Sequence, residues 1–165
     1  KGKNFLNLFS YTASASVYAA KGGARSSLSI DMSATYIDWA RHHFASNGIN
    51  TRKHQLLTAD CLQWLEEADE QFDLIYLDPP TFSNSKRMHS TLDVQRDQVQ
   101  LIGYALDLLS ENGELIFVTN HQRFKLDEAV FVEHGWQPEN ITAQTLDVDF
   151  QRSKKIHQCW LFRRA

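Results

Sequence analysis

The sequence predicts an α/β fold in which a mostly parallel sheet carries helices on both faces. Two observations predict it: strand-like apolar runs alternate with helix-compatible segments, and one run, Leu74–Leu77, carries no charge, as expected of a strand buried on both sides. The last two runs follow one another without a helical pattern between them, so we expect them to pair antiparallel. The predicted strands are Phe5–Phe9, Leu28–Ile30, Gln55–Thr58, Leu74–Leu77, Glu114–Thr119, Ile141–Leu146 and His157–Phe162.

Helical segments fill most of the gaps between these runs. Ser33 and Asp60 stand where an N-cap side chain would begin a helix, and Gly48 and Gly113 stand where glycine would end one. The predicted helices are Thr12–Lys21, Ala34–Asn47, Cys61–Ala68, Val94–Leu109 and Lys125–His134.

Composition limits the classes of protein to consider. The chain has 165 residues, enough for one domain, and 42% hydrophobic with 22% charged residues is ordinary for a globular protein. No apolar run is long enough to cross a bilayer, and the first residues lack the apolar stretch of a signal peptide, so we expect a cytoplasmic location. Because Cys61 and Cys159 lie far apart, neither a disulfide framework nor a zinc site is indicated.

The net charge of −3 argues against binding to nucleic acid through bulk electrostatics. Any contact with RNA must then be local. Lys86 and Arg87 form a basic pair a few residues after Pro79 and Pro80, and Arg96 follows at the start of the next predicted helix. We expect these three side chains to contact phosphates.

Four polar side chains mark the ends of successive predicted strands: Asn7, Asp31, Asp60 and Asp78. Because the carboxyl ends of parallel strands meet at one edge of a sheet, where ligands bind, we expect the four to converge there. Asp31 lies about 20 residues beyond the first turn, the position that accepts ribose hydroxyls in nucleotide sites. Helix capping remains an alternative for Asp31 and Asp60. A cationic ligand would relieve the repulsion between the acids.

Asp78 is followed by two prolines and, two residues further, by Phe82. Proline fixes φ and removes a backbone donor, so Pro79 and Pro80 would end the strand and hold Asp78 at its tip. A plain turn is the alternative, because Asp-Pro pairs often begin one.

These motifs together resemble a known enzyme family. The segments Leu6–Thr12, Asp31–Ser33, Ala59–Cys61, Asp78–Phe82 and Ile156–Trp160 resemble the C-terminal, guanine-N7-modifying domain of the bacterial bifunctional 23S ribosomal RNA large-subunit methyltransferases, enzymes of class I that use S-adenosylmethionine (SAM). The resemblance covers nearly the whole chain. It implies a Rossmann-like seven-stranded sheet with an antiparallel last strand, with residues 1–165 forming one SAM-dependent catalytic domain that acts on 23S rRNA.

The resemblance also implies roles for single residues, and it implies no metal site. Asp78, Pro79, Pro80 and Phe82 would form the catalytic loop, with Phe82 either stacking on a base or packing into the core. Asp78 would also face the cofactor. The other implied cofactor-binding residues are Asn7, Phe9, Ser10, Tyr11, Thr12, Ala13, Asp31, Met32, Asp60 and Cys61.

Three alternatives to guanine-N7 methylation remain. Cytosine C5 needs a covalent adduct to a cysteine thiolate, and no cysteine lies in or near residues 78–88, which disfavours that route unless Cys159 reaches the site. The first turn lacks the Gly-x-Gly-x-x-Gly pattern, which counts against a nucleotide-dependent oxidoreductase. A catalytically silent RNA-binding module would keep the same fold.

The first predicted strand begins at Phe5, almost at the start of the sequence. We therefore expect a fragment of a longer protein whose upstream part helps to select the substrate.

Overall fold

A seven-stranded sheet forms the centre of the computed structural model, which describes residues 1–84, 91–146, 149 and 156–165. The strand order is β3-β2-β1-β4-β7-β9-β8, and the first five run parallel. β9 runs antiparallel to both of its neighbours. The strands are β1 (Asn4–Leu8), β2 (Ser26–Asp31), β3 (His54–Thr58), β4 (Phe72–Leu77), β7 (Leu109–Thr119), β8 (Trp136–Asn140) and β9 (Gln158–Arg164).

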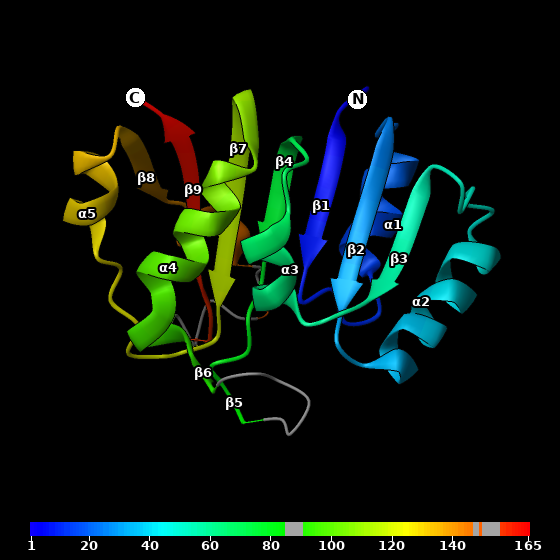
Figure 1. Cartoon of the computed structure of the whole chain (residues 1–165), viewed down its shortest axis with the longest axis horizontal. Coiled ribbons are helices and arrows are strands. Elements are labelled where there is room, and N and C mark those ends of the chain that lie inside the picture. Colours follow the sequence, from blue (N-terminus) through cyan, green and yellow to red (C-terminus); the bar gives the residue numbers. More distant parts are fainter. Residues whose placement is uncertain (85–90, 147–148, 150–155) are drawn as a thin grey trace.

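Helices lie on both faces of the sheet, as the sequence predicts. Figure 1 shows α3, α4 and α5 in front of the sheet and α1 behind it. A short hairpin of β5 (Phe82–Ser83) and β6 (Leu92–Asp93) stands apart from the main sheet. The helices are α1 (Ser14–Lys21), α2 (Ala34–Ser46), α3 (Cys61–Glu67), α4 (Val94–Asp107), α5 (Glu128–Glu133) and α6 (Thr142–Thr145).

The order of the strands reverses between β1 and β4. The chain passes from β1 outward through β2 to β3, then returns to place β4 on the other side of β1. In open α/β sheets the crevice at such a reversal, beyond the carboxyl ends of the strands, is where ligands bind. The fold therefore directs attention to the segments that follow β1 and β4.

The helix caps follow the sequence prediction at three of four positions. The Ser33 hydroxyl accepts a hydrogen bond from the Tyr36 amide at 3.3 Å, and a carboxylate oxygen of Asp60 accepts one from the Leu62 amide at 3.0 Å. Gly48 follows the end of α2 with φ +63°, which glycine adopts without strain. The prediction for Gly113 is wrong, because α4 ends at Asp107 and Gly113 lies inside β7.

The strand predicted at Ile141–Leu146 is also wrong. The partner of β9 is Trp136–Asn140, and Thr142–Thr145 forms the short helix α6. The Asn140 side chain accepts a hydrogen bond from the Thr142 amide at 3.0 Å, which turns the chain at the end of β8. The antiparallel pairing of the last two strands is confirmed. None of the described helices is both long and apolar enough to span a membrane.

A buried polar network ties β1 to α1 and β2. The Asn7 amide donates to the Ser16 hydroxyl at 2.9 Å, and the Ser16 hydroxyl lies 2.7 Å from that of Ser29. All three side chains are almost completely buried. Because a buried polar group that loses its partner keeps the full cost of desolvation, this network fixes α1 against the sheet.

We predict that Ser16→Ala lowers the free energy of unfolding by about 1–3 kcal/mol, because the Asn7 amide loses its acceptor. Ser14, at the exposed start of the same helix, provides the matched control, and Ser14→Ala should change stability by less than about 0.5 kcal/mol. Urea denaturation of both variants measures the difference. Equal stability of the two variants would show that the network contributes nothing.

Candidate functional site

The loop after β1 has an unusual backbone. Phe9, Tyr11 and Ala13 have φ values of 54°, 52° and 56°, in the left-handed region that glycine favours. Such strain persists only where the surrounding structure holds it, and it gathers at functional sites. The sequence has no glycine in this loop, so the positive φ values, which are typical of glycine-rich turns, could not be predicted from it.

Asp31, at the end of β2, holds this loop in place. One of its carboxylate oxygens accepts a hydrogen bond from the Tyr11 amide at 2.9 Å, and the other accepts from the Ser33 amide at 2.8 Å. Each oxygen keeps a second lone pair. Since Ser33 caps α2, the Asp31 carboxylate is oriented by backbone amides and can still accept hydroxyl groups.

Cys61 lies between the loop and the end of β2. Its sulfur accepts a hydrogen bond from the Phe9 amide at 3.3 Å and donates to the Ile30 carbonyl at 3.5 Å. Burial raises the pKa of the Cys61 thiol far above its usual range. Cys61 is thus an inert, apolar part of the site. The neighbouring Asp60 caps α3 with one oxygen, and no described residue donates a hydrogen bond to the other.

Asp78 occupies the tip of β4, on the other side of the strand reversal. Burial raises the pKa of its carboxyl to about 6, and a hydrogen bond from the Tyr76 hydroxyl opposes part of that rise. Pro79 is buried and Pro80 is exposed. Phe82, in the β5–β6 hairpin, is 56% exposed, so it is not part of the core.

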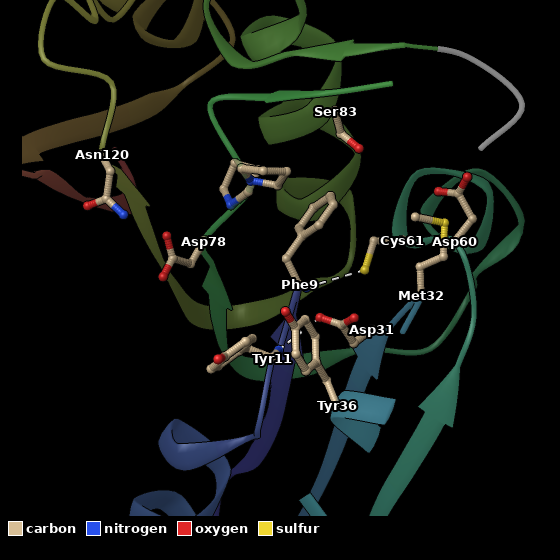
Figure 2. A pocket seen from close by; sticks show the side chains of 12 residues that line it. Phe9, Tyr11, Asp31, Met32, Tyr36, Asp60, Cys61, Asp78, Ser83 and Asn120 are labelled. Atoms are coloured by element: carbon tan, nitrogen blue, oxygen red, sulfur yellow. Dashed lines mark hydrogen bonds between the residues drawn. The ribbon is translucent and has the colours of Figure 1, made fainter. Parts of the chain in front are cut away.

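These segments surround one cavity of about 400 Å³, a size typical of small-molecule sites. In Figure 2 the Phe9 ring lies between Asp78 on one side and Cys61 on the other, with Asp31, Tyr11 and Tyr36 below. The lining residues are Phe9, Tyr11, Asp31, Met32, Tyr36, Asp60, Cys61, Asp78, Pro79, Pro80, Ser83 and Asn120. Three are acidic, and none of these described residues is Lys, Arg or His.

The structure brings together most of the residues that the sequence singles out. Three of the four polar strand ends, Asp31, Asp60 and Asp78, line the cavity. Asn7 does not line the cavity: its side chain is 2% exposed and donates a hydrogen bond to Ser16, because alternation along β1 turns it toward α1, so its predicted contact with a cofactor stays a prediction.

Some predicted residues lie outside the lining of the cavity. Ser10 and Thr12 are buried within the loop, and Ala13 packs against Ala40 and Phe44. These positions shape the backbone of the loop, while their side chains are absent from the lining. Their predicted contact with a cofactor stays a prediction.

Three residues of the lining were missed from the sequence. Tyr36 packs edge-on against Tyr11, with ring centroids 4.2 Å apart. Ser83 comes from the β5–β6 hairpin, and Asn120 directly follows β7. A polar residue directly after a predicted strand was the signal for Asn120, the same signal that identified Asp78.

Of the three residues predicted to contact phosphates, the structure describes only Arg96. Lys86 and Arg87 lie outside the described residues. The Arg96 guanidinium binds both oxygens of the adjacent Asp97 carboxylate, at 2.6 and 2.8 Å, and donates to the Thr91 carbonyl at 2.7 Å. A phosphate would have to compete with that paired carboxylate, so the role of Arg96 stays a prediction. Within the described part of the chain, no three His, Cys, Asp or Glu side chains gather as a metal site would require.

Comparison with known proteins identifies the family. The family model described as "Conserved hypothetical protein 95" matches residues 1–126. The chain belongs to that family. It is also 57% identical over 164 residues to the ribosomal RNA large subunit methyltransferase K/L of Cellvibrio japonicus, and 52% identical over 165 residues to that of Vibrio campbellii. These matches cover 99–100% of this chain but only 21–23% of the length of the relatives.

Solved structures agree with the family assignment. SMU.776, described as a methyltransferase and solved in complex with SAH, superposes with a TM-score of 0.84 at 30% identity, over 98% of this chain and 45% of that one. A SAM-dependent methyltransferase from Streptococcus mutans gives 0.80 at 28% identity, covering 98% of this chain and 44% of the other. The predicted Rossmann-like fold of SAM-dependent methyltransferases is confirmed.

The raised pKa of Asp78 has a cost in stability, and its pH dependence can be measured. A carboxyl whose pKa is higher in the folded than in the unfolded chain costs nothing below pH 4. The cost grows as the pH rises toward the folded value, about 6, and is then constant. We predict that Asp78→Asn stabilises the protein at pH 8 by about 1–3 kcal/mol, with a smaller gain at pH 5.

Urea denaturation of the unliganded protein at the two pH values measures this gain. Asp69, an exposed carboxylate after α3, provides the control, and Asp69→Asn should change stability little. An Asp78→Asn variant that is less stable at pH 8 than the original chain would contradict the prediction.

Proposed function

We propose that this domain binds SAM in the cavity beside β1 and β4 and transfers its methyl group to a base of 23S ribosomal RNA, at guanine N7. The observation that carries the proposal is the gathering of Asp31, Asp60 and Asp78 around one cavity, with no Lys, Arg or His among the described residues that line it. SAM carries a sulfonium and an ammonium group, so it supplies the positive charge that this cavity lacks. The neighbouring structure solved with SAH, the demethylated product of SAM, supports this choice of cofactor.

The cavity suggests one orientation for the cofactor. Asp31 would accept the ribose hydroxyls, because backbone amides already orient its carboxylate. Asp60 would accept from the adenine amino group, with Cys61 against the ring. The loop Phe9–Tyr11 would enclose the methionine end and direct the sulfonium toward Asp78, across the strand reversal.

The acceptor base would approach from the side of the diproline. Pro79 and Pro80 hold the Asp78 carboxylate at the tip of β4, where it can accept hydrogen bonds from the Watson–Crick edge of guanine. The exposed ring of Phe82 is free to stack on a base that has left the RNA stack. Guanine N7 has a free lone pair and loses no proton, so in-line attack needs positioning more than a general base.

The two cysteines favour N7 over cytosine C5. C5 methylation begins with attack by a thiolate, and thiolates form readily only when the pKa of the thiol is low. Burial raises the pKa of Cys159 to about 11 and raises that of Cys61 further. Neither thiol has the low pKa that favours the thiolate of the C5 route.

The relatives are about four to five times as long as this chain, so the activity of the whole protein involves more than this domain. We propose that residues 1–165 form its SAM-dependent catalytic domain, and that another domain of the same polypeptide helps to select the RNA. Lys86 and Arg87 remain the proposed phosphate contacts beside the diproline, and the proposal includes no metal.

We predict that Asp31→Asn weakens SAM binding by roughly 10- to 100-fold, the effect of losing hydrogen bonds to a charged group. Asp38→Asn is the control, because Asp38 is exposed on α2, where it forms an ion pair with Arg41 at 2.6 Å. Isothermal titration calorimetry with SAM and with SAH measures both variants at a temperature well below unfolding. Unchanged affinity of the Asp31→Asn variant would show that Asp31 does not bind SAM. Absence of binding by the original chain would refute the proposed cofactor.

We predict that the original protein forms 7-methylguanosine in 23S rRNA from cells that lack the gene, and that Asp78→Asn lowers the turnover rate by about 10²–10³-fold, as loss of a positioned polar group does elsewhere. Mass spectrometry of the digested nucleosides identifies the product, with Asp38→Asn as the active control. The full polypeptide encoded by the gene should be used.

Each other product pattern decides against part of the proposal. A methyl group found only on cytosine C5 would show that C5, and not guanine N7, is the methylated atom. SAM binding without methylation of any nucleoside would support a catalytically silent RNA-binding module.

A further inference from the structure

Asn120 is the first residue after β7, at the carboxyl edge of the sheet. Its side chain is exposed and lines the cavity proposed for SAM. It also lines a second cavity of about 360 Å³, which is bordered by Tyr76, Val118 and residues of α6 and β9. Asn120 therefore stands at the boundary between the two cavities. No described residue forms a hydrogen bond with its amide, so within that part of the chain nothing competes for its donors and acceptor.

Asp78 and Asn120 project from neighbouring strands to the same side of the sheet. β4 and β7 are parallel, and Tyr76 aligns with Ile116. Because side chains alternate along a strand, Asp78 lies on the side of Tyr76, and Asn120 lies on the side of Ile116. Figure 2 shows the Asp78 carboxylate and the Asn120 amide directed toward the same space. A ligand in that space can contact both groups.

This space is where the methyl acceptor would have to approach. In Figure 2, Asn120 lies on one side of Asp78, and Asp60 and Cys61, proposed to hold the adenine, lie on the other. SAM bound in that orientation brings its sulfonium toward Asp78. In-line transfer requires the acceptor atom to lie beyond the methyl group, on the side away from the adenine. Asn120 is on that side.

The backbone around Asn120 is held by the residues that follow it. The buried Thr119 hydroxyl accepts a hydrogen bond from the His121 amide at 3.2 Å. The Gln158 side chain donates to the carbonyls of His121 and Phe124, each at 3.2 Å. Side chains that bind a reacting group need such support, because a small displacement lowers the rate. The structure thus fixes the position of Asn120 while leaving its amide exposed.

The groups at this boundary match one base in particular. An ionised Asp78 only accepts hydrogen bonds, and the Tyr76 hydroxyl already donates to it and orients it. The Asn120 amide can donate. Guanine presents two donors, N1–H and the 2-amino group, beside the acceptor O6. Adenine has an acceptor at N1, which would face the Asp78 carboxylate.

We propose that Asn120 donates a hydrogen bond to O6 of the acceptor guanine and, together with Asp78, selects that base and orients its N7. This inference rests on the proposed function and assigns a specificity-determining residue to it. O6 and N7 are neighbouring acceptors on one edge of guanine, so a donor at O6 fixes the angle at which N7 meets the methyl group.

The experiment measures kcat/KM for formation of 7-methylguanosine by the full polypeptide encoded by the gene, with saturating SAM and 23S rRNA from cells that lack the gene. Asn120→Ala removes the donor and should lower kcat/KM by roughly 10- to 100-fold, as loss of a base contact does. Asn120→Asp keeps the shape but sets a carboxylate against O6, so it should be slower again by roughly tenfold. Asn112→Asp is the matched control, because Asn112 is exposed at the opposite end of β7, and its rate should stay within about twofold of the original.

Calorimetry with SAM separates this role from cofactor binding. Both Asn120 variants should bind SAM within about threefold of the original affinity. A loss of SAM affinity as large as the loss of rate would place Asn120 against the cofactor and overturn the inference. An Asn120→Asp variant faster than Asn120→Ala would also overturn it, because the shape of the side chain and not its donor would then matter.

Failure of this inference is distinguishable from failure of the proposed function. Guanosine methylation by the original protein, at rates that both Asn120 variants match, would overturn the role of Asn120 and leave the proposed function intact. Absence of 7-methylguanosine with the original protein would refute both.

Discussion

Three carboxylates share one small cavity, and this concentration of negative charge governs the chemistry of the site. Each carboxylate is held differently. Asp31 accepts hydrogen bonds from two backbone amides, and Asp60 caps α3. Burial of Asp78 raises the pKa of its carboxyl to about 6. No Lys, Arg or His is among the described residues that line the cavity, so a cation bound there would balance this negative charge. A cationic cofactor would therefore reduce the repulsion among the three carboxylates.

The loop that faces these acids depends on them for its shape. Phe9, Tyr11 and Ala13 occupy left-handed conformations that cost side-chain-bearing residues free energy. Asp31 and Cys61 offset part of that cost, because they accept hydrogen bonds from the Tyr11 and Phe9 amides, respectively. The residues proposed to bind the cofactor thus also hold the backbone that encloses it, so changes at Asp31 affect both stability and binding.

The sheet joins this site to the rest of the protein. One face supplies a closed core, which is enough to fix the order of the strands and bring the ends of β1 and β4 together. The other face leaves apolar side chains of β4, β7 and β9 partly exposed, and Tyr76 connects that face to Asp78. The same strand therefore carries the candidate active site at its tip and links it to both faces of the sheet.

The sequence by itself determined the class of fold, the mostly parallel arrangement of the strands, and three acidic strand ends that line the cavity, Asp31, Asp60 and Asp78. These follow from local rules, because strand ends and helix caps depend on neighbouring residues. The last hairpin was misplaced by a few residues, since Ile141–Leu146 is as apolar as a strand but the turn at Asn140 makes it helical.

Only the tertiary structure decided which side of a strand each residue faces and what meets it there. Asn7 was assigned to the cofactor because it is polar near a strand end, yet the pleat of β1 directs it to Ser16. The raised pKa of Asp78 and the left-handed loop likewise arise from residues distant in the chain. Burial and electrostatics depend on all neighbours in space, and a linear pattern records only neighbours in sequence.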